Sequence, residues 1–209
     1  TRLYHQWTVL ISSVELVKEL TDIGIPQAFH VKIIEKWGSG AKKIIEEDPY
    51  NLIQIVGIGF IRADQIAQTM KVALDDPRRL SAAIGHCLEI QEGRGHTWTP
   101  AQELFMDVYK LTRVAPTLQN IPSSVECLSG NRLIRKILKS AEERIVSGIM
   151  RLSTSTSYRP VSNRPDLTDF SDLLEQQKQA VNVAASHPIS IITGSPGTGK
   201  TFCIKKLLE

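Results

Sequence analysis

Eight residues near one end of the 209-residue sequence match the pattern GxxxxGK[ST]. They are Gly194, Ser195, Pro196, Gly197, Thr198, Gly199, Lys200 and Thr201. Glycines let a loop wrap closely around a phosphate, so that backbone N–H groups and the next helix N-terminus point at the negative charge. A lysine at this spacing reaches the β and γ phosphates, and the adjacent threonine hydroxyl holds Mg²⁺. The pattern predicts a site for ATP and Mg²⁺.

The chemistry of this loop requires a strand before it and a helix after it. The apolar run Ile189-Ser190-Ile191-Ile192 predicts a buried strand of a parallel sheet. Beyond the loop, Ile204 and Leu207 lie three residues apart on a predicted helix. We expect both to face the sheet, which leaves Lys205 and Lys206 in solvent.

A second glycine motif, Val56-Gly57-Ile58-Gly59, is flanked by apolar residues at helical offsets. This arrangement is typical of a helix-hairpin-helix element, in which Gly57, Ile58 and Gly59 and the next helix N-terminus offer backbone N–H groups to a DNA phosphate. Arg62 could add a positive charge. A purely structural turn also needs glycine, so both interpretations stay open. An earlier copy at Ile23-Gly24-Ile25, followed by Pro26, is interpreted as structural.

Other side chains show weaker patterns. His86 and His96 lack metal-ligand spacing, and Trp37 and Trp98 are expected to anchor the core or turns rather than stack on bases. Basic residues form three clusters, each either a solvated helix face or a phosphate contact. These clusters are Lys42 with Lys43, Arg78 with Arg79, and Arg132 with Arg135, Lys136 and Lys139.

Composition sets broad limits. A net charge of +3 permits an anionic partner but does not by itself argue for nucleic acid. Cys87, Cys127 and Cys203 form no CxxC pair and are interpreted as reduced core thiols. No apolar run approaches the roughly 18 residues of a membrane helix, and the first residues do not resemble a signal peptide. We expect a cytoplasmic protein without a membrane partner.

Upstream of the loop the sequence predicts mainly helices. One helix includes residues 14–20, the next ends at Gly38, and Asp48-Pro49 begins a third. A capping box is predicted at residues 99–102, and residues 134–149 carry apolar side chains at the spacing of a longer helix. Asp76-Pro77 opens a helix with an apolar face formed by Leu80, Ala83, Ile84, Cys87 and Leu88.

Several segments of the sequence resemble the RecD/TraA type of superfamily 1 DNA helicase, in particular the stand-alone RecD-like helicases often named exodeoxyribonuclease V alpha subunits. The resemblance rests on residues 48–67 around the hairpin, Gly95-His96-Thr97, Ala141-Glu142, and Ile192-Thr193-Gly194 entering the loop. It implies movement from 5′ to 3′ on single-stranded DNA, driven by two RecA-like domains that hydrolyse ATP at their interface. It also implies that Gln177 hydrogen-bonds adenine.

The resemblance suggests an N-terminal fragment that ends just after the GxxxxGK[ST] loop. The Mg²⁺-coordinating Asp-Glu motif, the arginine finger and the second RecA-like domain of such helicases have no counterpart here, so the fragment alone is not expected to hydrolyse ATP. Ser195 stands where glycine is usual, and residues 130–134 are short where relatives carry a wing-like hairpin. Nothing resembles a nuclease site.

The predicted fold class is mainly α: helix-hairpin-helix and helical regions, followed by the start of a P-loop RecA-like α/β domain. The expected domains are a tandem helix-hairpin-helix region at 1–72, a helical domain at 73–152 with a winged-helix form as an alternative, a Ser/Thr/Pro-rich linker at 153–166, and the RecA-like start at 167–209.

The expected partner is DNA, either single-stranded or at a junction with duplex, bound without sequence preference. Two other functions stay open. One is a DNA- or protein-binding helical module with a passenger loop, and the other is a different P-loop ATPase of the AAA+ kind. Gln177 and the upstream hairpins favour the helicase.

Overall fold

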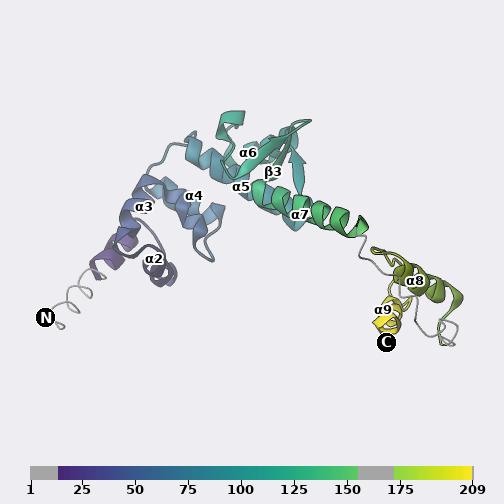
Figure 1. The fold of residues 1–209 in the computed structure, drawn as a ribbon. Helices are drawn as coiled ribbons and strands as arrows, with labels where there is room; N and C mark the ends of the chain where they lie inside the picture. The colour runs from purple at the N-terminus through teal and green to yellow at the C-terminus, as the bar shows by residue number, and fades with distance from the viewer. Residues whose placement is uncertain (1–13, 155–171, 209) are drawn as a thin grey trace. The chain divides into compact units, whose positions relative to one another are not determined.

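The computed structural model describes residues 14–154 and 172–208 (Figure 1). Within these ranges the chain is mainly helical, with one small antiparallel sheet, which confirms the expected fold class. The chain divides into two compact units, Thr1–Lys139 and Ser140–Glu209. Among the described residues, no helix is both long enough and apolar enough to cross a membrane.

The described part of the first unit begins with a helix at residues 14–22. Its other α-helices are α2 (His30–Trp37), α3 (Ala41–Glu47), α4 (Phe60–Thr69), α5 (Pro77–Gly93) and α6 (Ala101–Thr112). Short 3-10 helices lie between them: η1 (Gln27–Phe29), η2 (Gly38–Gly40), η3 (Pro49–Gln54) and η4 (Leu118–Asn120). The predicted stop at Gly38 is confirmed, and Asp48 does begin a helix, although of the 3-10 type.

One hydrophobic core extends through this unit, from the helix at 14–22 to the sheet. Its largest fully buried side chains include Leu20, Ile33, Leu52, Phe60 and Leu104. All five residues of the apolar face predicted for α5 are buried, and Ala83, Ile84, Cys87 and Leu88 belong to this core, as their helical spacing required. The helix-hairpin-helix residues and the α5–α6 region therefore share one interior.

The sheet consists of β1 (Trp98–Pro100), β2 (Val125–Leu128) and β3 (Arg132–Arg135) in the order β1-β3-β2. Strands β2 and β3 form a hairpin whose turn at 129–131 uses Gly130 (φ 76) and Asn131 (φ 53). This is a wing-like element, in the segment that the sequence suggested was too short for one.

Two helix predictions near the sheet were wrong. Thr99 does not cap α6, because it lies buried in β1 opposite Leu133, and the N-cap residue of α6 is Pro100. Ile134 does not belong to the long helix, because it pairs within β3 and α7 (Lys136–Ser153) begins after it. In both cases the residue forms strand pairs in the sheet, although the local sequence pattern predicted that it belongs to a helix.

The second unit contains α8 (Glu175–Ser186) and α9 (Lys200–Leu208) and has a small core of Leu173, Val181 and Cys203. Helix α7 spans the division between the units and buries no residue. Residues 155–166 of the predicted linker lie outside the described residues, and Ser153 is the last residue of α7.

The strand predicted at 189–192 is not formed, and Ile191 is 86% exposed. A strand needs a neighbour to complete its ladder, and the described part of this unit contains none. Helix α9 accordingly turns Cys203 and Leu207 to the small core, whereas Ile204 stays half exposed. The prediction that Ile204 faces a sheet was wrong for the same reason.

Candidate nucleotide and nucleic-acid sites

The glycine loop is held in a shape that needs its glycines. Gly197 (φ 81) and Gly199 (φ 82) adopt left-handed backbone conformations that other residues enter only with strain. A Cβ atom on Gly194 would lie 2.7 Å from the Thr198 hydroxyl oxygen. The loop therefore tolerates no side chain at these three positions without rearrangement.

Lys200 lies against the loop at the start of α9. Its Nζ donates to the carbonyl oxygens of Gly194 (2.8 Å) and Ser195 (2.9 Å), and the Thr198 hydroxyl also donates to Ser195 (2.8 Å). The first backbone bond into α9 runs from Cys203 N–H to the Gly199 carbonyl, so the N–H groups of the preceding turn have no partner in the helix. A lysine ammonium and free amides at one place suit a phosphate chain.

Gln177 lies against this loop although it is 17 residues upstream of Gly194. Its Nε2 donates to the Thr198 carbonyl (3.1 Å), and its Oε1 accepts from the Leu174 N–H (3.0 Å). A Cβ atom on Gly199 would come within 2.5 Å of that Nε2. Both ends of the amide are engaged, so contact with adenine would require one bond to be exchanged. Thr201 is exposed in the first turn of α9.

The second glycine motif forms a tight hairpin between η3 and α4. Gly57 has φ 100, and Ile58 is buried and donates its N–H to the Ile55 carbonyl (2.9 Å). Val56 at the tip is 80% exposed. Gly59 is the N-cap residue of α4, has extended backbone and provides no side-chain cap. The first N–H groups of α4 are thus left for another acceptor.

Two lysines of α2 lie on the same hairpin. The Nζ of Lys32 donates to the Val56 carbonyl (2.9 Å), and that of Lys36 donates to the Gln54 carbonyl (3.1 Å). They are four residues apart on one helix face and both are exposed. Sequence analysis missed them, because no local pattern indicates that α2 packs across a hairpin twenty residues away.

Arg62 and Phe29 complete this cluster. The Arg62 guanidinium donates to the Gly57 carbonyl (2.8 Å) and stacks over the Phe29 ring at 4.9 Å, while the Lys32 ammonium lies 5.9 Å from the ring centre. A Cβ atom on Gly57 would lie 3.1 Å from the Phe29 ring. We call Lys32, Lys36 and Arg62 the hairpin cations. They bring positive charge from two helices to one turn.

Six of the eight basic residues in the three predicted clusters are paired with acids. Lys42 contacts Glu19 (2.8 Å), Lys43 contacts Glu47 (3.8 Å), and Lys139 contacts Glu126. Arg135 contacts Glu92 and Glu89, and the bond with Glu92 raises the pKa of Arg135. Arg78 pairs with Asp76 (2.6 Å), and this hydrogen bond lowers the pKa of the Asp76 carboxyl.

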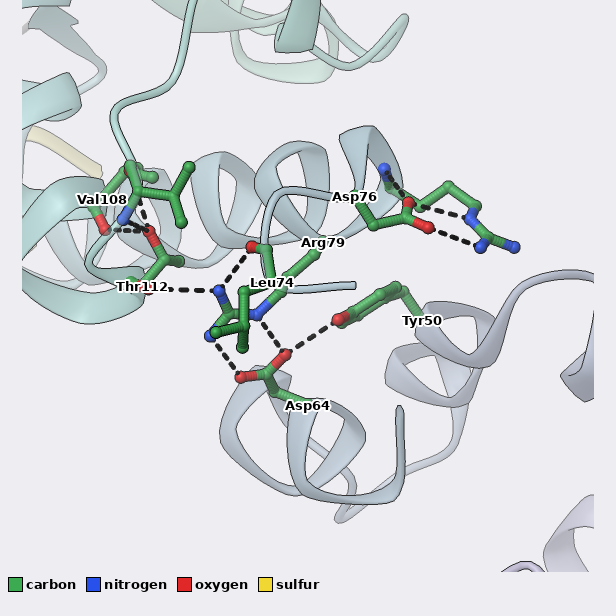
Figure 2. Close-up of polar contacts among 9 residues, drawn as sticks. Tyr50, Asp64, Leu74, Asp76, Arg79, Val108 and Thr112 are labelled. Carbon is green, nitrogen blue, oxygen red and sulfur yellow. Dashed lines mark hydrogen bonds and ion pairs between the residues drawn. The ribbon is translucent and has the colours of Figure 1, made fainter. Parts of the chain in front are cut away.

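Arg79 is neither a solvated side chain nor a phosphate contact, so that prediction was wrong. It is buried and forms two parallel bonds to Asp64 on α4, at 2.8 and 3.0 Å (Figure 2). It also donates to the carbonyls of Leu74 (2.8 Å) and Thr112 (3.1 Å). The Tyr50 hydroxyl donates to the same carboxylate (2.8 Å), and burial and this bond raise the pKa of Tyr50. The network ties α4 to α5 and α6.

Several remaining residues differ from expectation. Trp37 packs on the core, as predicted, but Trp98 is 41% exposed with the Arg132 guanidinium 4.9 Å from its ring. Cys87 and Cys203 are buried free thiols, whereas Cys127 is exposed, so its assignment to the core was wrong. Cys127 lies on β2, an edge strand in which Val125 is the only buried residue, so a position on this strand does not by itself bury a side chain.

Two family models match separate parts of the chain. Residues 12–98 match the helix-hairpin-helix domain of the ATP-dependent RecD2 DNA helicase, and residues 177–209 match an AAA domain. The first covers the hairpin, the hairpin cations and the Asp64–Arg79 pair. The second begins at Gln177 and includes the whole glycine loop.

The individual relatives are RecD2 and RecD proteins, which agrees with the first family model. The ATP-dependent RecD2 DNA helicase of Deinococcus radiodurans is 26% identical over 93% of this chain and 30% of its own length. The RecBCD enzyme subunits RecD of Mycobacterium tuberculosis and Mycolicibacterium smegmatis are each 35% identical over 32% of the chain, which is 11% and 12% of their lengths. The chain thus spans less than a third of these relatives. Both glycine motifs lie inside matched regions, and at both of them this chain is similar to the RecD-like DNA helicases.

Proposed function

We propose that this chain supplies two binding elements to an ATP-dependent DNA helicase that moves from 5′ to 3′: a phosphate loop for ATP and a hairpin for the DNA backbone. The observation that carries the DNA part is the uncapped N-terminus of α4, with the hairpin cations bonded to the turn beside it. Backbone amides and cations that reach phosphates but no base edges favour binding without sequence preference. A cytoplasmic location is part of the proposal, because the relatives that this chain matches come from bacteria, whose DNA lies in the cytoplasm.

The loop residues fit ATP and Mg²⁺. The left-handed glycines leave space for a phosphate chain, and the Lys200 ammonium, now held by two loop carbonyls, can exchange these for phosphate oxygens. Gly194 to Gly199 would cradle the phosphates, Thr201 would hold Mg²⁺ and Gln177 would bind adenine. The bound ion would neutralise charge on the β and γ phosphates.

We further propose that the 209-residue chain binds ATP but does not hydrolyse it alone. Hydrolysis needs a positioned water and transition-state charge stabilisation, and only the phosphate-holding part of that machinery has been identified in the described residues. Phosphate release should stay at background with or without DNA. Release at the rate of an intact helicase, abolished by Lys200→Ala, would refute this part.

DNA binding is tested by fluorescence anisotropy of labelled oligonucleotides against salt. We expect weak binding, with a slope of log affinity against log salt of roughly minus two to minus four, at about 0.7 to 0.9 per phosphate contacted. Replacing all three hairpin cations by alanine should flatten the slope by about two. The matched control is Lys42→Ala with Lys43→Ala, because both lysines are paired with glutamates away from the hairpin. Equal slopes for the triple variant and the parent would refute the proposal.

A further inference from the structure

A groove of about 680 Å³ lies in the first unit and is not used by either proposed site. Its lining on α5 includes the small residues Ser81, Ala82 and Gly85. One wall comes from η3, with Asn51 and Gln54, and the other from residues 119–124. The volume lies within the range of about 300 to 1,000 Å³ that is usual for pockets that enclose small ligands.

The groove begins at the DNA-binding hairpin. Gln54 and Phe60 line it, and these two residues directly flank the hairpin at 55–59. Gln54 also carries the carbonyl that accepts from Lys36, and Phe60 is the first residue of α4, where the free amides lie. A strand with one phosphate at the hairpin would therefore have its next nucleotides at the groove mouth.

A stack of rings ends in the groove. Tyr50 and Phe60 are buried and nearly parallel, with ring centres 6.2 Å apart, and His86 stacks on Phe60 at 5.6 Å. His86 is the half-buried end of this stack and lines the groove. A planar base can extend such a stack, and stacking accepts every base because each has a π face.

The polar lining suits base edges better than phosphates. Gln119 offers an amide that can both donate and accept, and Gln54, whose Nε2 donates to the Asn51 Oδ1 (3.1 Å), can exchange this exposed bond for a base edge. The charged side chains in the lining are paired or used as caps: Arg78 pairs with Asp76, Glu89 pairs with Arg135, and Asp48 accepts from the Tyr50 N–H. The groove offers a phosphate no unpaired lysine or arginine, whereas the hairpin does, so the backbone should stay at the hairpin while the bases turn inward.

We propose that this groove binds the unpaired bases of a single strand whose backbone is held at the hairpin. The inference rests on the proposed DNA function and makes its substrate class specific. Bases inside a duplex are stacked and paired, so the groove can act only on an unpaired strand or on the single-stranded side of a junction. The hairpin provides affinity for any phosphate backbone, and the groove provides the preference for single strands.

Gly85→Leu tests the proposal in the full chain. A Cβ atom on Gly85 meets nothing within 4 Å and its φ is not positive, so a leucine there should fill the groove without strain. Gly93→Leu is the matched control, because Gly93 lies on the same helix, is equally open and does not line the groove. The probes are a dT oligomer, an abasic oligomer of equal length and a duplex, each followed by anisotropy.

We expect the parent and Gly93→Leu to bind the dT oligomer more tightly than the abasic oligomer or the duplex. Gly85→Leu should weaken dT binding roughly fivefold to a hundredfold, the range for one lost stacked base, and leave abasic and duplex binding and the salt slope unchanged. If Gly85→Leu binds dT like the parent, the groove proposal is overturned while the hairpin stands. If the parent binds no probe, both proposals fall.

Discussion

Arg79 should contribute far more to stability than its neighbour Arg78, although both are arginines paired with aspartates. Arg79 is 6% exposed and makes four hydrogen bonds, two to Asp64 and two to backbone carbonyls. Replacing it by methionine leaves the Asp64 carboxylate, itself largely buried, without its cation, and two carbonyls without donors. Breaking a buried ion pair in this way costs about 3–5 kcal/mol.

Arg78→Met is the matched control. The Arg78 side chain is 42% exposed, and exposed ion pairs contribute about 0–1 kcal/mol. Trp37 and Trp98 belong to the first unit and none of the three tryptophans lies after residue 98, so tryptophan fluorescence during urea unfolding does not report on the second unit. With a urea slope of about 2 kcal/mol per molar, Arg79→Met should lower the midpoint by about 2 M and Arg78→Met by less than 0.5 M.

A double-mutant cycle shows whether the pair itself carries the effect. Asp64→Leu alone removes the acceptor for Arg79 and for Tyr50, whereas Arg79→Met with Asp64→Leu leaves no buried charge. The double variant should lose less stability than the two single losses added together, by about 0.5–3 kcal/mol. If the losses of stability in Asp64→Leu and Arg79→Met are strictly additive, the buried pair does not carry the effect. If Arg78→Met and Arg79→Met lose equal stability, burial does not make Arg79 the more important arginine.

Three further predictions concern single positions. Gly57→Ala should destabilise the first unit by about 1–3 kcal/mol in the same urea assay, because the φ of Gly57 is 100 and the Phe29 ring lies against the new methyl group. Gly59→Ala is the control and should change the stability by less than about 1 kcal/mol. Equal losses of stability in the two variants would contradict this. Asp76→Ala removes the N-cap of α5 and should cost about 1 kcal/mol at pH 7. Because folding lowers the pKa of Asp76, its contribution is present above its ordinary pKa of 3.8 and lost as pH falls below that value, so urea midpoints of parent and variant should converge in acid. Cys127 should react rapidly with a thiol reagent at pH 8 because it is exposed, and Cys87 should react slowly because burial raises its pKa to about 11. If a Cys127→Ser variant still shows the fast phase of the reaction, Cys127 is not the fast-reacting thiol.

The sequence alone determined the features that depend on local backbone chemistry. The glycine loop, the hairpin at Gly57, the stop at Gly38 and the start of α5 at Asp76 were all predicted, because glycine geometry, proline position and helix caps act over a few residues. The buried face of α5 was also predictable, since a helix repeats its apolar side chains at a fixed spacing.

Tertiary structure decided the features that need a partner distant in sequence. In the sequence Arg79 cannot be distinguished from Arg78, and only the packing of α4 places Asp64 beside it. Lys32 and Lys36 contact the hairpin only because α2 packs against it. Residues 189–192 have the composition of a strand but form none, because backbone ladders form only when a second strand lies alongside. Helix spacing and turn conformation depend on residues that are close in the sequence. Burial, ion pairing and strand pairing depend on which distant segments pack against each other.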